Sequence, residues 1–548
     1  MIQERILELT EYGLVTGLIE PQDKRFTINR LLELFHIDEL EDEVTAAYEK
    51  RTPMTQESAE EALPQILAEM LDYAAEQMLL TLFPDERPVY PDGRPTGDRA
   101  ELRLMSGAKV TTATCVLVYQ GRTANGRTSV PNEELTDPNE TDRRLQGAVK
   151  RAFYRAAMGI GLPHRPWGML TGVRPGKLMT PLLAQGMGDV QAARYFERHY
   201  DVAPARAALV VRTAHATLRA MDSLGEKDVC LYVGIPFCPT RCAYCSFVSQ
   251  SVEKSMALVP EFLQALAREI AATAEAVHRA GLRVVSLYIG GGTPTTLSAR
   301  QLDALCTQLD AAFDLSALRE FTVEAGRPDT ITADKLHVLR AHRVDRISVN
   351  PQTLDDRVLE TIGRRHTAQD IYDALQLVRA TGGFAVNMDL IAGLPGDTPA
   401  GFRTTLEQVL ALAPENITVH TLSRKRGADL SQQTASVPDG AQVGEMLDFA
   451  NTALDTAGYA PYYLYRQKFM SGGFENVGWT RPGQENLYNI CVMEELCSIL
   501  AMGGGASTKL VCPGGRLERH IDPKYPTEYI ANIDRICAAK AKLEAFFL

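Results

Sequence analysis

Three cysteines lie close together in the segment IPFCPTRCAYCSF, residues 235–247. Cys238, Cys242 and Cys245 have C-x3-C-x2-C spacing, so three soft thiolates on one short loop can converge on a single metal centre. A structural zinc site is normally closed by a fourth Cys or His, and none lies nearby in the sequence. The pattern therefore favours a [4Fe-4S] cluster that leaves one iron open to bind another molecule. A zinc site completed by a distant ligand and thiols without a metal remain as alternatives.

Short β-rich runs alternate with helical segments after about residue 228, and they must position this loop. Six such strands joined by helical crossovers predict a parallel sheet, curled as a partial (β/α)6 barrel. In such folds the chemistry lies at the carboxyl ends of the strands. There the sequence places the three cysteines, GGGTPT, Glu324, Gln352, Asp389 and His420 in turn, so one end of the sheet is expected to bind a ligand. The expected strands are 229–235, 284–291, 320–326, 346–352, 385–393 and 416–422.

The rest of the chain divides around this barrel. We expect an α+β accessory domain at 1–225, the barrel at 226–430, and a smaller C-terminal region that covers the substrate at 431–548. Helical spacing is present at 2–19 and 60–83. Residues 101–120 predict two strands across a turn, followed by a polar loop and a helix near 142–161.

Composition narrows the class of protein. The chain has 548 residues, 45% of them hydrophobic and 23% charged, which is typical of a globular protein with two or three domains. Its net charge of −12 comes from residues 1–100, which carry −13, and no basic region predicts a nucleic-acid partner. No stretch reaches the roughly 20 apolar residues of a membrane span. Ten cysteines are too few for a disulfide framework, and we expect a cytoplasmic protein.

The cysteine loop followed by GGGTP after the next strand resembles the radical S-adenosylmethionine (SAM) superfamily. The longer segments LYVGIPFCPTRCAYCSF, YIGGGTPT, FTVEAGRPD and NMDLIAGLPGD are similar to the oxygen-independent coproporphyrinogen III dehydrogenase group, and most closely to its HemZ branch. The resemblance implies that SAM occupies the open iron. The reduced cluster then cleaves SAM to methionine and a 5′-deoxyadenosyl radical, with a flavodoxin or ferredoxin-type protein as electron donor.

The same resemblance assigns roles to individual residues. It implies that Asp389 accepts hydrogen bonds from the ribose hydroxyls of SAM and that Tyr232 lies beside the cluster, where it contributes to catalysis. The cofactor-binding positions that it implies are Tyr232, Tyr244, Gly291, Gly292, Thr293, Glu324, Gln352, Arg364 and Asp389.

The implied substrate is a tetrapyrrole, and the implied reaction is oxidative decarboxylation of coproporphyrinogen III to protoporphyrinogen IX. Propionate arms require basic side chains. Lys425 and Arg426 are the leading candidates, with Arg424, Arg466 and Lys468 nearby. Where the group has His and Cys, this chain has Gly234 and Phe247, so a haem-binding chaperone and another radical SAM reaction on haem stay open. A second cluster at Cys491, Cys497 and Cys512 is a further alternative.

Overall fold

The computed structural model describes residues 73–83, 97–135, 138–245, 250–251, 255–423, 436–467, 471–511 and 517–547. The chain forms two compact units, of which the first holds the residues up to Thr171 together with Arg198–Ala203, and the second holds the rest. The helix expected at 2–19 lies outside the described residues. The boundaries expected at 225/226 and 430/431 remain predictions about functional parts. No helix in the described ranges is both long enough and apolar enough to cross a membrane.

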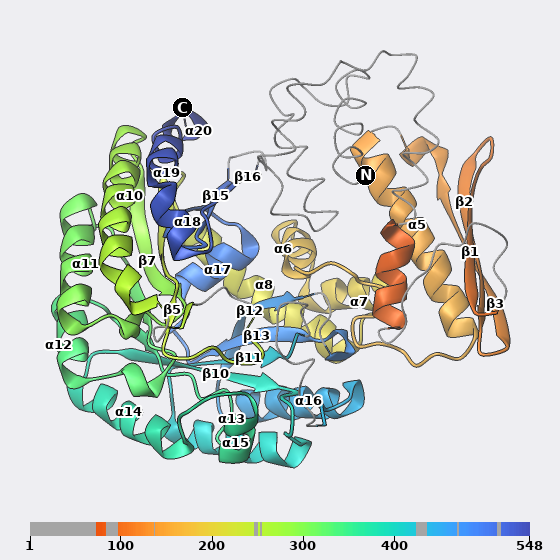
Figure 1. Cartoon of the computed structure of the whole chain (residues 1–548). Coiled ribbons are helices and arrows are strands. Elements are labelled where there is room, and N and C mark those ends of the chain that lie inside the picture. The colour runs from red at the N-terminus through yellow and green to blue at the C-terminus, as the bar shows by residue number, and fades with distance from the viewer. Residues whose placement is uncertain are drawn as a thin grey trace. The chain divides into compact units, whose positions relative to one another are not determined.

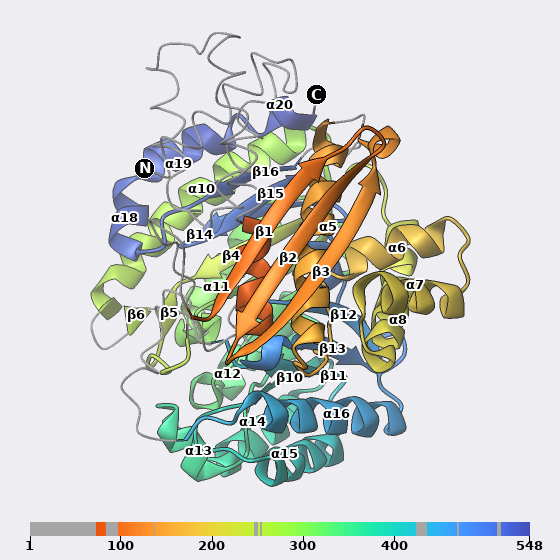
Figure 2. The ribbon, with the colours of Figure 1, turned by 90° about the vertical axis from the view of Figure 1, so that its right-hand side faces the viewer.

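The first unit contains a three-stranded antiparallel sheet, packed against a long helix (Figure 2). The prediction of a polar loop after the second strand is wrong, because residues Arg122–Pro131 form the third strand. That strand turns small residues toward the helix: a Cβ added to Gly126 would overlap the carbonyl oxygen of Ala152. The helix expected near 142–161 is confirmed, and residues 73–82 are also helical. The elements are β1 (Arg99–Ser106), β2 (Val110–Tyr119), β3 (Arg122–Pro131) and α5 (Pro138–Gly159).

The second unit is built on an 11-stranded sheet whose order is β12-β13-β11-β10-β9-β8-β7-β4-β14-β15-β16. The six strands expected from the sequence are confirmed, and they are adjacent and parallel in chain order. As far as the described residues show, the sheet curls without closing, since β12 and β16 form its edges. The six strands are β4 (Asp228–Ile235), β7 (Arg283–Gly291), β8 (Glu320–Glu324), β9 (Arg346–Ser348), β10 (Ala385–Ala392) and β11 (Asn416–Thr421).

The C-terminal region extends this sheet at both ends. β13 pairs antiparallel with β11, whereas β14 pairs parallel with β4. The region expected to cover the substrate is therefore also part of the sheet, and its covering role remains a prediction. Its elements are β12 (Ala460–Arg466), β13 (Glu475–Thr480), α17 (Leu487–Glu494), β14 (Ser498–Gly503), β15 (Ser507–Val511), β16 (Leu517–Ile521), α18 (Pro526–Ala531), α19 (Ile533–Lys540) and α20 (Glu544–Phe547).

Helices cover the outer side of the curved sheet (Figure 1). α10 shows the cause, since Phe262, Leu266 and Ile270 are spaced four residues apart and are buried on one helix face. In β8, Phe321 and Val323 alternate with Glu320, Thr322 and Glu324, so one face of the strand is polar. The helices of this unit are α6 (Gly176–Ala184), α7 (Asp189–Tyr200, up to Glu197), α8 (Pro204–Ser223), α10 (Val259–Arg279), α11 (Ala299–Ala312), α12 (Ala333–Ala341), α13 (Asp356–Thr361), α14 (Ala368–Thr381), α15 (Pro399–Leu412) and α16 (Gly440–Thr456).

Candidate active site

The cysteine loop follows directly on β4, at its carboxyl end. Cys238 ends the short strand β5 (Phe237–Cys238), and its Sγ lies 3.4 Å from Thr293 Oγ1. Cys242 and Cys245 come after it on the same loop, where the backbone N–H of Cys245 donates to the carbonyl oxygen of Cys242. All three thiols are partly exposed, whereas five other described cysteines are buried. The loop thus presents three partly exposed cysteines at the end of a buried strand.

The glycine-rich segment after β7 lies against this loop. Backbone N–H groups of Gly292 and Thr293 donate to the carbonyl oxygens of Ile235 and Phe237, at 2.8 and 2.7 Å. A Cβ at Gly292 would lie 2.6 Å from Phe237 O, and Gly291 has a φ of +106°. Both positions need glycine, one for close approach and one for its backbone conformation. Gly291, Gly292 and Thr293 are therefore brought together with the cysteines.

Two buried arginines approach the cysteine loop from segments that follow strands, Arg327 after β8 and Arg364 between α13 and α14. Arg327, in the segment after β8, donates to Cys242 Sγ at 3.3 Å and to Thr240 Oγ1 at 2.8 Å. Arg364 donates to the hydroxyl oxygen of Tyr244 at 3.1 Å and to the carbonyl oxygen of Asn350 at 2.7 Å. The Arg327 contact was not predicted from the sequence. The order of the strands in the sheet places Arg327 beside Cys242, and the spacing of the two residues in the sequence does not indicate it. Arg327 therefore places a positive charge beside one thiol of the cysteine loop.

Glu324 and Tyr232 face the inner side of the sheet. Tyr288 donates its hydroxyl hydrogen to Glu324 Oε1 at 2.6 Å. Burial raises the pKa of Glu324 to about 7. The ring of Tyr232 stacks against those of Tyr288 and Tyr488, with both pairs of centroids 6.1 Å apart. Tyr232 thus belongs to a buried aromatic stack, of which the sequence indicated one member.

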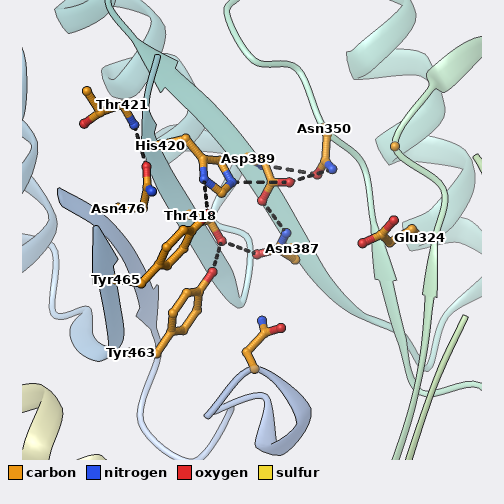
Figure 3. Close-up of polar contacts among 12 residues, drawn as sticks. Glu324, Asn350, Asn387, Asp389, Thr418, His420, Thr421, Tyr463, Tyr465 and Asn476 are labelled. Atoms are coloured by element: carbon orange, nitrogen blue, oxygen red, sulfur yellow. Dashed lines mark hydrogen bonds and ion pairs between the residues drawn. The ribbon is translucent and has the colours of Figure 1, made fainter. Parts of the chain in front are cut away.

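Asp389, on β10, is the centre of a polar network on the inner face (Figure 3). Its two carboxylate oxygens accept hydrogen bonds from Asn350 Nδ2 at 2.7 Å and Asn387 Nδ2 at 2.8 Å. His420 Nε2 lies 3.9 Å from the same carboxylate. Burial acts to raise the pKa of Asp389. The interaction with His420 and the hydrogen bond from Asn387 act in the opposite direction and outweigh burial, so the pKa of Asp389 is lowered. Asp389 is therefore held as a carboxylate.

Gln352 lies beside this network through its backbone. Its N–H donates to the carbonyl oxygen of Asp389 at 2.9 Å, and its own carbonyl oxygen accepts from Ile391. Gln352 is buried and has a φ of +66°, which is uncommon for a residue other than glycine. The fold thus holds the backbone of Gln352 directly beside β10.

The basic residues expected to bind substrate are described only in part. Arg424, Lys425, Arg426 and Lys468 lie outside the described residues, as do Phe247 and Cys512. Arg466 is buried and donates to the carbonyl oxygen of Gly473 at 2.8 Å. Burial lowers the pKa of Arg466 to about 10. Arg466 thus bonds to the protein's own backbone, and the nearby charge of Glu475 opposes the lowering of its pKa.

Known proteins resemble this chain in sequence. The radical SAM superfamily model matches residues 232–409. The oxygen-independent coproporphyrinogen-III oxidase-like protein HemZ of Bacillus subtilis (strain 168) is 37% identical over 421 residues, 75% of this chain and 84% of that protein. The heme chaperone HemW of the same strain is 32% identical over 250 residues, 45% and 64% of the two chains. The solved coproporphyrinogen III oxidase (HemN) of Escherichia coli covers 59% of this chain and 72% of its own, with 26% identity and a TM-score of 0.46.

The fold and the cysteine loop, with the superfamily match, define the class as radical SAM proteins. Within that class the chain belongs to the HemZ family of oxygen-independent coproporphyrinogen-III oxidase-like proteins. Its cofactors are accordingly a [4Fe-4S] cluster and SAM. The donor set fits this cluster, because three accessible thiols lie beside a glycine segment and an arginine.

Proposed function

We propose that this protein is a radical SAM oxidoreductase that converts coproporphyrinogen III to protoporphyrinogen IX without oxygen. The observation that carries the proposal is the 37% identity with a coproporphyrinogen-III oxidase-like relative across 84% of its length. The site geometry supports it, since a thiol loop and an ordered set of polar side chains lie at the same end of the strands. When bound, the cluster and SAM would supply the radical that removes a hydrogen atom from each reacting propionate. Each propionate would then lose CO2 and pass one electron to an external electron acceptor, which leaves a vinyl group.

The protein's own residues hold these groups in place. In this proposal Cys238, Cys242 and Cys245 bind the cluster, while Gly291, Gly292 and Thr293 accept the methionine end of SAM. The polar groups of SAM contact residues on the inner face of β8 to β10 and in the loops after them. Those residues are Glu324, Gln352, Arg364 and Asp389, and Tyr244 contributes through its hydrogen bond with Arg364.

The substrate is assigned to the same end of the sheet. Lys425 and Arg426 follow β11 in the sequence, and we assign them to the anionic propionates of the tetrapyrrole. Tyr232 lies in the stack next to Tyr288, which is hydrogen bonded to Glu324, and it gives the cofactor region a dry aromatic wall. A flavodoxin or ferredoxin-type protein is the proposed electron donor.

A haem chaperone is the second candidate. The observation that favours it is the 32% identity with the heme chaperone HemW of Bacillus subtilis. That alignment covers 64% of the relative, against 84% of the HemZ protein, so the oxidase-like assignment has the broader support. In the chaperone alternative the chain keeps the cysteine loop and binds haem but does not convert a porphyrinogen.

Anaerobic reconstitution with product analysis separates the two candidates. Reconstituted protein is mixed with SAM, a reductant and coproporphyrinogen III, and the products are separated by chromatography. Release of CO2 with formation of divinyl product supports the oxidoreductase. SAM cleavage that leaves coproporphyrinogen III intact, combined with tight haem binding, contradicts it and favours the chaperone.

The raised pKa of Glu324 predicts a pH dependence for SAM binding. Below about pH 7 the carboxyl group is protonated and neutral, and above it the carboxylate accepts hydrogen bonds from SAM. We expect SAM affinity to rise with pH through this value, by at most about tenfold per unit. Burial raises the pKa of Glu324 in the folded protein above its value in the unfolded chain. The unliganded protein is therefore expected to lose stability as the pH rises toward about 7, while its affinity for SAM increases.

Calorimetric titration of SAM on either side of pH 7 measures the effect. The Glu324→Gln variant is the matched control, since its amide does not titrate and its affinity should be flat. An equal pH response in wild type and variant would assign the titration to another group.

A further inference from the structure

Three buried cysteines outside the loop meet at the amino end of β4. Cys230 lies on β4, Cys491 on α17, and Cys497 directly before β14. Their sulfur atoms all lie within 4.8 Å of one another. Cys230 and Cys491 are fully buried, and Cys497 keeps 7% of its surface exposed. Cys230 and Cys497 are 267 residues apart in the sequence, so the fold alone brings them together.

The spacing of these sulfur atoms fits a single metal ion. Cys230 Sγ and Cys497 Sγ are 3.6 Å apart, far beyond the roughly 2.05 Å of a disulfide bond. Two zinc–sulfur bonds of about 2.3 Å that meet at a tetrahedral angle separate their sulfurs by about 3.8 Å. An iron–sulfur cluster binds its cysteines through different iron atoms and spaces them more widely. The three thiols are therefore close to the arrangement that one tetrahedral ion requires.

The surroundings of the three thiols favour a divalent ion. The side chains packed around them include the apolar and aromatic residues Tyr488, Ile499 and Leu496. The carboxylates of Glu320 and Asp228 lie near enough to act on the charge of Cys491 and Cys497. Residual charge is costly in such a place. Of the metals that thiolates select, zinc leaves one negative charge on three thiolates, whereas copper(I) leaves two. At a zinc site with three cysteine ligands, water can be the fourth ligand.

We propose that Cys230, Cys491 and Cys497 bind one zinc ion, at a site separate from the radical SAM cluster. Cys230 is the third residue of β4, and the strand continues for five more residues, about 16 Å, before the cysteine loop begins. The rings of Tyr232, Tyr288 and Tyr488 pack in the same cluster of side chains. Zinc at this site joins α17 and the start of β14 to the first strand of the barrel, and so fixes the C-terminal region to it.

Metal analysis of the full-length chain tests this site. Anaerobically reconstituted protein is mixed with zinc, freed of excess metal by gel filtration, and analysed for iron and zinc. We expect about one zinc per chain in addition to the cluster iron, with three sulfur neighbours at about 2.3 Å by X-ray absorption. Cys491→Ala and Cys497→Ala should each weaken zinc binding by more than about 100-fold and leave the iron content unchanged.

Two further variants serve as controls. Cys306→Ala, which removes an equally buried thiol on α11, should retain the zinc. Cys242→Ala should also retain it, because that thiol belongs to the cluster loop. Wild-type protein without zinc, or zinc that depends on Cys242 and not on Cys491, overturns the proposal. Copper(I) held in preference to zinc, with the same dependence on Cys491, overturns the choice of metal.

Discussion

Replacing Cys242 with alanine is expected to abolish SAM cleavage. The side chain accepts a hydrogen bond from Arg327, lies in the middle of the cysteine loop, and is one of the three cysteines that we propose as ligands of the cluster. Without it, cluster binding through three cysteines is lost, so 5′-deoxyadenosine production should fall to background. Wild-type protein should hold about four irons of the cluster per chain. The measurement is anaerobic iron analysis together with chromatography of 5′-deoxyadenosine.

A matched cysteine distinguishes this loss from a general loss of folding. Cys306 is buried on α11, away from the strand ends, and Cys306→Ala should keep both the iron and the activity. Cys238→Ala and Cys245→Ala should behave like Cys242→Ala. Undiminished 5′-deoxyadenosine from the Cys242 variant would refute the cluster assignment.

Much of the barrel was predictable because buried parallel strands have a clear pattern. β4 and β7 are nearly continuous apolar runs that end in polar or glycine-rich segments, and helical periods lie between them. β3 was missed for a physical reason: its inward positions include Ala124 and Gly126, so the apolar alternation of a strand is absent. Close packing of the helix on this small-residue face replaces the burial of large side chains.

The pairing of the C-terminal strands was not predictable from local pattern. β14 is buried along its whole length and pairs with β4, although the two are more than 260 residues apart in the chain. Periodicity indicates that a segment is a strand but carries no information on its partner. The meeting of Cys230 with Cys491 and Cys497 depends on that pairing, so the sequence suggested a group of Cys491, Cys497 and Cys512 but did not indicate Cys230.

The residues of the candidate site likewise divide into those that the local sequence indicates and those that only the fold brings together. The cysteine loop, the glycine segment and Glu324 have sequence signals, since each directly follows or ends a strand. Asp389 was expected at a strand end but lies inside β10, with its side chain on the inner face of the sheet. Arg327 carries no such signal, because its contact with Cys242 crosses from the loop after β8 to the loop after β4. Asn387 likewise has meaning only as a donor to Asp389 within the folded sheet.

Removal of the Asp389 carboxylate is expected to weaken SAM binding by about 1–3 kcal/mol, roughly 5- to 150-fold. In Asp389→Ala the side-chain amides of Asn350 and Asn387 lose their shared acceptor, and the proposed contact with the ribose hydroxyls is lost as well. The cluster should be unaffected, because the three cysteines proposed to bind it lie on a different segment of the chain. Anaerobic calorimetry with reconstituted protein measures the SAM dissociation constant, and iron analysis measures the cluster.

The matched control is another buried carboxylate far from the strand ends that hold the site. Asp228 lies at the amino end of β4, where it accepts hydrogen bonds from Arg283 and from the backbone N–H of Gly225. Asp228→Ala should lower the free energy of unfolding and leave SAM affinity unchanged, whereas Asp389→Ala should change the affinity at constant iron content. If Asp389→Ala instead loses iron or folding while the remaining protein binds SAM normally, Asp389 holds the inner face of the sheet together and does not contact the nucleoside.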